Sequence, residues 1–182
     1  YELSKVEKLN IRGSINHIIK NDKDVIMATD NGVAVLQEKM FIPHFTDLTQ
    51  EYIHDLAYHE ENGKIFATDG THILQIDEET HDAFILFTSG GSKIMQVLPY
   101  QNAVWVGDEA GTLSQIYNGR VIRRYDLSKY GNAIYDLAGD QNGNIWICQD
   151  NLNGIIRLST DGNLKIFGAA DGLTSKATFA AN

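Results

Sequence analysis

Val25-Ile-Met-Ala-Thr-Asp30 is the stretch that decides the fold, because it returns almost unchanged as Lys64-Ile-Phe-Ala-Thr-Asp69. The corresponding segments of two further repeats are Ala103-Val-Trp-Val-Gly-Asp108 and Asn144-Ile-Trp-Ile-Cys-Gln149. The large residue at the centre of each copy is Met27, Phe66, Trp105 or Trp146, which gives spacings of 39, 39 and 41 residues. A constant period of about forty residues is typical of a repeat architecture in which each repeat is one supersecondary unit.

A second series of apolar residues keeps the same register upstream of each copy. Its members are Ile15, Ile53, Ile94 and Ile134, at spacings of 38, 41 and 40 residues, and each begins a short alternating run. Further strand-like runs follow in every repeat, first at 33–36, 72–76, 112–116 and 155–158, then at 39–42, 83–87, 121–125 and 164–167. Four short apolar runs in each repeat predict four β-strands in each repeat.

The segments between these runs are rich in turn residues. The chain has 16 Gly but only 2 Pro, and Asn-Gly or Asp-Gly pairs stand at 31–32, 62–63, 118–119, 142–143, 153–154 and 161–162. Such pairs favour tight hairpins, so each repeat is predicted to be a four-stranded antiparallel meander. A single meander cannot bury both of its faces, whereas meanders stacked face to face around an axis can. The sequence therefore predicts an all-β fold, a β-propeller segment, with the large central residues packed between blades.

The repeats place four complete blades at about residues 14–51, 52–92, 93–132 and 133–172. Residues 1–13 contain one strand-like piece, at 6–11, and are predicted to be a partial blade. Residues 173–182 contain another, at 177–180, and are predicted to begin a further blade. We therefore expect residues 1–182 to be a single propeller fragment, an arc of a larger ring. Its end blades would be covered by the remaining blades of a parent protein or by a second copy of this chain.

Composition excludes several classes of function. The formal net charge is −9, whereas a nucleic-acid surface requires clustered Lys and Arg. No window approaches the eighteen or so uninterrupted apolar residues of a membrane span, so no direct membrane contact is expected. The single cysteine, Cys148, cannot form an intramolecular disulfide and lies in an apolar strand pattern, which predicts an inert buried thiol.

The predicted innermost strands carry polar or aromatic residues where a core strand would be apolar. The ligand-binding candidates on them are His17, His54, Asp55, Gln96, Tyr135 and Asp136. Polar donors and acceptors beside an aromatic ring suit a sugar-like ligand, and function on a propeller is expected at the central channel and the rim loops. The alternative is that these groups satisfy one another or bind channel water, and the sequence leaves both interpretations open.

No pattern in the chain predicts a catalytic residue, a metal site or a cofactor. The six histidines lack the close spacing of a metal-binding pair. Asp140-Gln-Asn-Gly-Asn144 is similar to a calcium loop but lacks its closing Glu, so a hairpin turn is the better interpretation. Thr88-Ser-Gly-Gly-Ser92 is the only Gly/Ser cluster and is interpreted as a linker loop between the second and third repeats.

The fourth repeat has the most specific order of motifs. It reads Ile134-Tyr-Asp-Leu-Ala-Gly-Asp140, Asn142-Gly-Asn-Ile-Trp-Ile147, Gly154-Ile-Ile-Arg157 and Asp171-Gly-Leu-Thr-Ser175. This order resembles the two-component regulator propeller repeat, which is found in the periplasmic sensor region of bacterial hybrid histidine kinases. The resemblance is weaker in the first three repeats, which lack the Arg and the Asp-Gly-Leu-Thr-Ser link.

The resemblance implies a periplasmic, non-enzymatic signal-input segment of a membrane-bound sensor kinase, with any kinase activity in parts outside this chain. It also implies a nutrient ligand, such as an oligosaccharide released from a complex glycan. Two alternatives stay open at this point. One is a propeller enzyme of the lyase or lactonase type, whose blades also use Gly-Asn-Ile-Trp strands and which needs a coherent His, Glu or metal cluster at the channel. The other is a protein-interaction scaffold.

Overall fold

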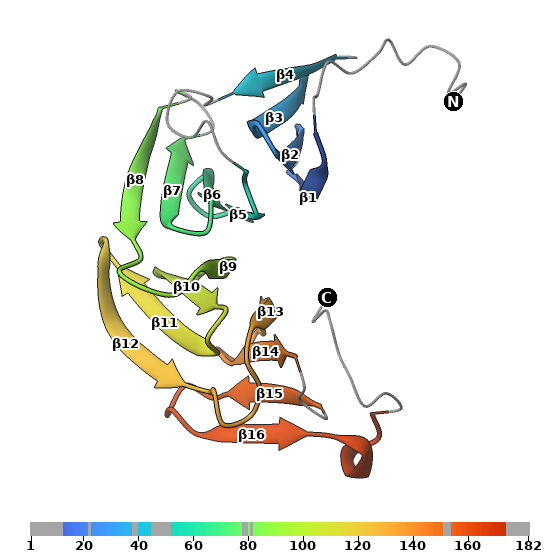
Figure 1. The fold of residues 1–182 in the computed structure, drawn as a ribbon, viewed down its shortest axis with the longest axis vertical. Helices are drawn as coiled ribbons and strands as arrows, with labels where there is room; N and C mark the ends of the chain where they lie inside the picture. Colours follow the sequence, from blue (N-terminus) through green and yellow to red (C-terminus); the bar gives the residue numbers. More distant parts are fainter. Residues whose placement is uncertain are drawn as a thin grey trace. The chain divides into compact units, whose positions relative to one another are not determined.

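The computed structural model describes residues 13–21, 23–37, 40–44, 52–77, 80, 82–150 and 154–173. These residues form four sheets of four strands, and in each sheet the strands follow one another in chain order. Neighbouring strands run antiparallel, so each sheet is a meander and each meander is one propeller blade (Figure 1). The predicted all-β fold of four four-stranded blades is therefore confirmed. A short 3₁₀ turn at Ala169–Asp171 is the helical element of the described residues.

We call the meanders sheets one to four. Sheet one contains β1 Ile15–Lys20, β2 Val25–Thr29, β3 Gly32–Gln37 and β4 Met40–His44. Sheet two contains β5 Asp55–His59, β6 Lys64–Thr68, β7 His72–Asp77 and β8 Ala83–Thr88. Sheet three contains β9 Ile94–Tyr100, β10 Ala103–Asp108, β11 Thr112–Tyr117 and β12 Arg120–Asp126. Sheet four contains β13 Ile134–Gly139, β14 Ile145–Gln149, β15 Ile155–Leu158 and β16 Leu164–Phe167.

The chain divides into two compact units, Tyr1–Leu86 and Phe87–Asn182, with the boundary inside β8. The first unit contains one apolar core, formed between sheets one and two. Ile26, Ala28 and Val33 of sheet one pack there with Ile65 and Leu74 of sheet two. Alternate residues of a strand point to the same face, and this periodicity directs the apolar residues of β2 and β6 into the core.

The core of the second unit lies between sheets three and four. Trp105 and Leu113 pack against Ile147 and Ile156, and the Trp105 ring stacks on Tyr125 with centroids 6.3 Å apart. The prediction that the large central residues are buried holds for three of them, with relative exposures of 2% at Met27, 5% at Phe66 and 7% at Trp105. The fourth differs, since Trp146 is partly buried and its ring contacts Phe167 at 5.3 Å.

The Asn-Gly pair between β11 and β12 shows why the turn residues predicted the meanders. Asn118 has φ 48° and Gly119 has φ 73°, so both central residues of this two-residue hairpin are left-handed. Tyr117 pairs with Arg120 directly across the turn. Asn and Gly are the residues that adopt this backbone at least cost, and the turn fixes the register of the two strands.

The second sheet begins later than the sequence pattern predicts. The alternating run starts at Ile53, but β5 starts at Asp55. The Ile53 N–H donates to the Thr29 carbonyl of sheet one at 3.0 Å, so this residue bonds the neighbouring sheet instead of extending its own. Its side chain is fully buried in the core of the first unit. Ile53 is thereby bonded to β2, the second strand of sheet one.

Some predictions concern parts of the chain outside the described residues. Of the partial blades predicted at 1–13 and 173–182, only residues 13 and 173 are among the described residues. The strand-like pieces predicted at 6–11 and 177–180 lie outside them. Within the described part of the chain, helices of the length and apolar character needed to cross a bilayer are absent.

Candidate functional site

The first strands of sheets one and two, β1 and β5, are neighbours in the first unit. They bring together two of the predicted site residues, because His17 Nδ1 is hydrogen-bonded to Asp55 Oδ1. The Asp55 side chain is 2% exposed, whereas the His17 side chain is 41% exposed. A carboxylate accepts hydrogen bonds, so Nδ1 carries the proton and the imidazole is held in one tautomer and one orientation. The pair thus consists of a buried orienting group and an accessible ring.

Asn16, next to His17, strengthens the same junction. Its Nδ2 donates to the Ile53 carbonyl at 2.9 Å and to Asp30 Oδ1 at 3.3 Å. The other Asp30 oxygen accepts the Ser14 backbone N–H at 2.7 Å, and this bond is the main reason why the pKa of Asp30 lies below its ordinary value. Asn16 therefore ties the two sheets together and acts as a structural neighbour of the His17–Asp55 pair.

His54 has a different environment from His17, although both were predicted as site residues. Its ring packs edge-on against Tyr52, with centroids 4.3 Å apart and planes at 79°. Its backbone N–H donates to the Thr68 carbonyl at 2.7 Å, just before β5 begins. The Tyr52 ring is 40% exposed. The ring beside His54 is therefore that of Tyr52, a residue that the sequence did not single out, whereas the predicted aromatic candidate, Tyr135, lies in the second unit.

The other predicted site residues, Gln96, Tyr135 and Asp136, belong to the second unit. They lie on β9 and β13, which are neighbours there, and Gln96 pairs with Gly107 across the sheet. Tyr135 is 39% exposed, and Asp136 Oδ1 accepts its neighbour Leu137's N–H at 2.9 Å. The structure thus places these three on adjacent strands and gives the carboxylate a local backbone partner.

A β-bulge recurs near the start of three of the first strands. The pairing register shifts between Ile15 and His17 in β1, and between Ile134 and Asp136 in β13, so Asn16 and Tyr135 are the extra residues of these two bulges. In β9 the shift falls opposite Gly107 and Asp108. A bulge adds one residue to a strand and re-aims the side chains beside it. Strict alternation therefore does not predict the direction of the side chains beside these bulges.

The turn at Asp140–Asn144 is organised as a hairpin, as interpreted from the sequence. Asp140 Oδ1 accepts the backbone N–H groups of Asn142 and Asn144 at 2.9 and 3.0 Å. Its Oδ2 accepts the Asn144 amide at 2.8 Å and Trp146 Nε1–H at 2.9 Å. These bonds, that of the Asn144 side chain first, lower the pKa of Asp140 to about 2. Within the described residues, no group of three or more His, Cys, Asp or Glu is arranged to hold a metal ion.

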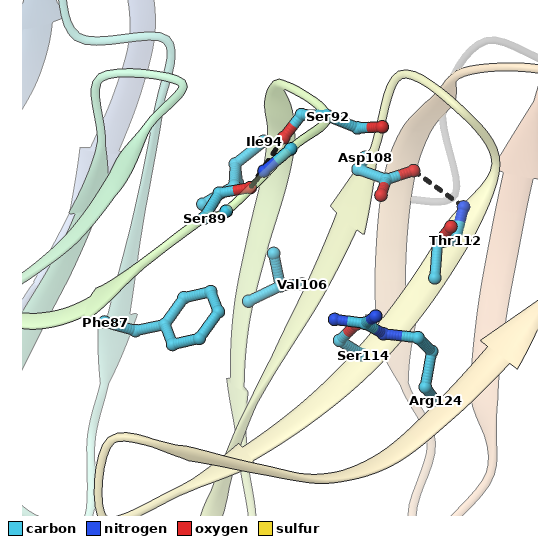
Figure 2. A pocket seen from close by; sticks show the side chains of 11 residues that line it. Phe87, Ser89, Ser92, Ile94, Val106, Asp108, Thr112, Ser114 and Arg124 are labelled. Atoms are coloured by element: carbon cyan, nitrogen blue, oxygen red, sulfur yellow. Dashed lines mark hydrogen bonds between the residues drawn. The ribbon is translucent and has the colours of Figure 1, made fainter.

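A pocket of about 370 Å³ lies wholly within the second unit (Figure 2). It is lined by Phe87, Ser89, Gly90, Gly91, Ser92, Ile94, Val106, Asp108, Thr112, Ser114 and Arg124. Ser89–Ser92, which belong to the Gly/Ser cluster interpreted from its composition as a linker loop, are part of this lining. Sequence reasoning missed this pocket because composition alone does not distinguish a rim loop from a linker.

No family model matches the chain, and no curated protein matches its sequence. Solved structures match its fold. A catalytically inactive variant of virginiamycin B lyase from Staphylococcus aureus, crystallised with quinupristin, is 14% identical with a TM-score of 0.75, over 96% of this chain and 61% of that one. The extracellular domain of a proposed hybrid two-component system, BT4673 from B. thetaiotaomicron, is 18% identical with a TM-score of 0.69, over 90% and 24%. The WD40 propeller domain of Doa1 is 15% identical with a TM-score of 0.71, over 94% and 57%.

These likenesses lie well below 25% identity and show a β-propeller fold. The chain spans about half the length of the lyase and WD40 propellers that it matches, and about a quarter of the sensor chain.

Proposed function

We propose that this chain is a ligand-sensing segment of a signal-input propeller in a membrane-bound sensor protein. The observation that carries the proposal is the bond between buried Asp55 and the accessible His17 on neighbouring first strands. Apolar packing would suffice to hold two sheets together there. A recognition site needs a polar group held in a fixed orientation by a supporting group, and this pair has that construction.

The sensor context has two supports. The motif order of residues 134–175 resembles the two-component regulator propeller repeat. One structural neighbour is the extracellular domain of a proposed hybrid two-component system. In this proposal the chain works outside the cytoplasmic membrane, in the periplasm, and the remaining blades, membrane helix and kinase belong to the rest of the protein. The segment itself would bind and transmit, without catalysis.

An oligosaccharide is the proposed ligand at the His17–Asp55 pair. The imidazole offers a directional hydrogen bond to a hydroxyl group, and the exposed Tyr52 ring offers an apolar face in the same unit. Sites that combine a few oriented polar groups with aromatic surface are typical of small-molecule recognition. A neutral sugar uses both features without requiring a charged partner.

A thermal-shift screen of the 182-residue chain against neutral oligosaccharides tests the proposal. A ligand that binds only the folded state raises its stability, by about 2.7 kcal/mol at a hundred times the dissociation constant. His17→Gln should abolish the shift, because a glutamine amide can still donate to Asp55 but cannot replace the accessible imidazole. His72→Gln is the matched control, since His72 is also paired with a carboxylate, Asp69, at 2.8 Å.

If the ligand raises the melting temperature equally in both variants, the His17–Asp55 pair does not take part in ligand binding. The sensor context has a separate test, which is to read the whole reading frame that contains this chain. A frame that encodes a propeller with no membrane helix and no signalling domain contradicts it.

A lyase activity is the second candidate, and the same pair favours it. An imidazole oriented by a carboxylate is the usual arrangement of a general base. One structural neighbour is virginiamycin B lyase, crystallised with quinupristin. Incubating the chain with quinupristin and following its conversion by chromatography tests this candidate, with His17→Gln as the control. Conversion that requires His17 would favour the lyase over the sensor.

A further inference from the structure

One face of sheet three carries a row of side chains whose position is set by strand register. Val106 on β10 pairs with Ser114 on β11, and Ser114 pairs with Arg124 on β12. Directly opposed residues of antiparallel strands project to the same face of the sheet. The opposite face carries Trp105 and Leu113, which belong to the core shared with sheet four. The row Val106–Ser114–Arg124 is therefore on the face turned away from that core.

The matching row in sheet four has the opposite chemistry. Ile147 pairs with Ile156, and Ile156 pairs with Ile166. Ile147 and Ile156 are fully buried in the core that they form with sheet three. In the first unit, the corresponding pair of sheet two is Ala67 and Leu74, also buried. The other three sheets have apolar residues at the position of Ser114, namely Val33, Leu74 and Ile156, so Ser114 departs from the repeat. At the position of Arg124, sheet one has His44 and sheet four has Ile166.

Ser114 and Arg124 line the pocket, which also has apolar residues in its lining. Ile94 and Val106 are buried and form part of its lining. Figure 2 shows the Phe87 ring and the Arg124 guanidinium reaching toward Val106 from opposite sides. At about 370 Å³ the pocket is near the small end of the range of roughly 300–1,000 Å³ typical of small-molecule sites. A ligand of about monosaccharide size could contact the apolar floor and the guanidinium together.

The charged groups of the pocket are available to a ligand. Across the described residues, the Arg124 guanidinium has no hydrogen-bond or ion-pair partner, and its side chain is exposed. Asp108 Oδ1 accepts the backbone N–H groups of Ala110 at 3.0 Å and Thr112 at 2.7 Å. Those two bonds hold the carboxylate in place and use one of its oxygens. The other oxygen of Asp108 remains as an acceptor, together with the Ser114 hydroxyl in the same lining.

We propose that this pocket binds a small hydroxylated carboxylate of about monosaccharide size, with a uronic acid as the representative probe. Arg124 takes the carboxylate, because the planar guanidinium matches it with two parallel hydrogen bonds. Asp108 and Ser114 take hydroxyl groups, and Phe87 and Val106 contact the apolar face of the ring. This inference rests on the proposed sensing function. It adds an acidic ligand, which would bind at a second site in the chain.

The test is isothermal titration of the full 182-residue chain with D-glucuronate, up to about 10 mM so that millimolar affinity is detected. D-Glucose and inorganic phosphate are titrated in parallel. Arg124→Gln should weaken glucuronate binding about tenfold or more, since a hydrogen bond between charged groups is lost. Arg123→Gln is the matched control, because Arg123 is the adjacent residue on the same exposed strand but is absent from the pocket lining. It should bind as the unaltered chain does.

Ser114→Ile gives a second, independent variant. It restores the residue type that sheet four has at the matching position, fills part of the pocket and removes a hydroxyl group. It should retain the melting temperature of the unaltered chain and lose glucuronate binding. This variant keeps the test decisive if Arg124→Gln fails to fold.

Each outcome decides between defined alternatives. Glucuronate binding that depends on Arg124 but not on Arg123 supports the proposal. No heat of binding with glucuronate, glucose binding of equal strength that is lost in Arg124→Gln, binding of phosphate alone as an adventitious ion only, or unchanged glucuronate binding in Ser114→Ile overturns it. None of these results affects the neutral-sugar shift that depends on His17, so the failure of this inference and the failure of the proposed function can be distinguished.

Discussion

The two units of the molecule join their sheets in different ways. In the first unit the junction between β1 and β5 is polar, with His17 bonded to Asp55 and Asn16 bonded to the Ile53 carbonyl. In the second unit the junction between sheets three and four is steric. A Cβ on Gly107 would lie 2.7 Å from Ile134 Cβ and closer still to Cγ2, so only glycine allows this approach. The same blade architecture thus has a polar pair at the junction of one unit, whereas Ile134 leaves no space beside Gly107 at the junction of the other.

The largest effect is expected from opening the apolar junction of the second unit. Trp105→Ala removes a 7% exposed ring from the core between sheets three and four and should lower the free energy of unfolding by about 3–5 kcal/mol. Tyr117→Ala, on the same sheet and 48% exposed, should change it by less than about 0.5 kcal/mol. Urea unfolding followed by circular dichroism measures both. Equal losses would show that this junction does not hold the unit together.

A second prediction concerns the glycine that permits close approach. Gly107→Ala places a methyl group against Ile134 and should destabilise the chain by about 1–3 kcal/mol through overpacking. Gly90→Ala is the control, because a Cβ there has no atom within 4 Å, and it should be close to neutral. If the two variants melt at the same temperature, the junction is looser than the structure indicates.

The sequence predicted the blades well because their determinants are local. The forty-residue period, the alternation and turns such as Asn118-Gly119 specify strands and hairpins without reference to distant residues. The same pattern could name His17 and Asp55 as polar residues of first strands. It could not show that they bond, because that depends on the bulge in β1 and on the position of Ile53, whose N–H bonds the other sheet.

The pocket of the second unit was missed for a related reason. Composition assigned Ser89–Ser92 to a linker, and Arg124 stands in an exposed strand where a charged residue needs no explanation. The signal that could have found it was present in the repeats. Aligning Ser114 with Val33, Leu74 and Ile156 shows a polar residue at a position where the other repeats are apolar. Differences between repeats carried more functional information than the consensus.

A double-mutant cycle tests the polar junction of the first unit. His17→Ala, Asp55→Ala and the double variant should give a coupling energy of about 1–2 kcal/mol, at the lower end for a charged hydrogen bond because the imidazole is half exposed. The His72–Asp69 pair, in the same unit, supplies a comparison cycle. A coupling energy near zero for His17 and Asp55 would mean that the carboxylate does not orient the ring. The junction of the first unit would then not differ from that of the second by a polar interaction.

The smallest effect is a pH dependence from the turn of sheet four. The pKa of Asp140 is lowered to about 2 in the folded chain, against an ordinary value of 3.8. A carboxyl group whose folded pKa is depressed stabilises the fold above its unfolded pKa, and this stabilisation is lost as the pH falls toward the folded value. Asp140→Asn should therefore lower the urea midpoint at pH 7 and flatten its decline between about pH 4 and pH 2. Asp82→Asn, at another exposed loop carboxylate, should leave that decline unchanged, and a decline that is equally steep in Asp140→Asn would assign the acid sensitivity to other groups.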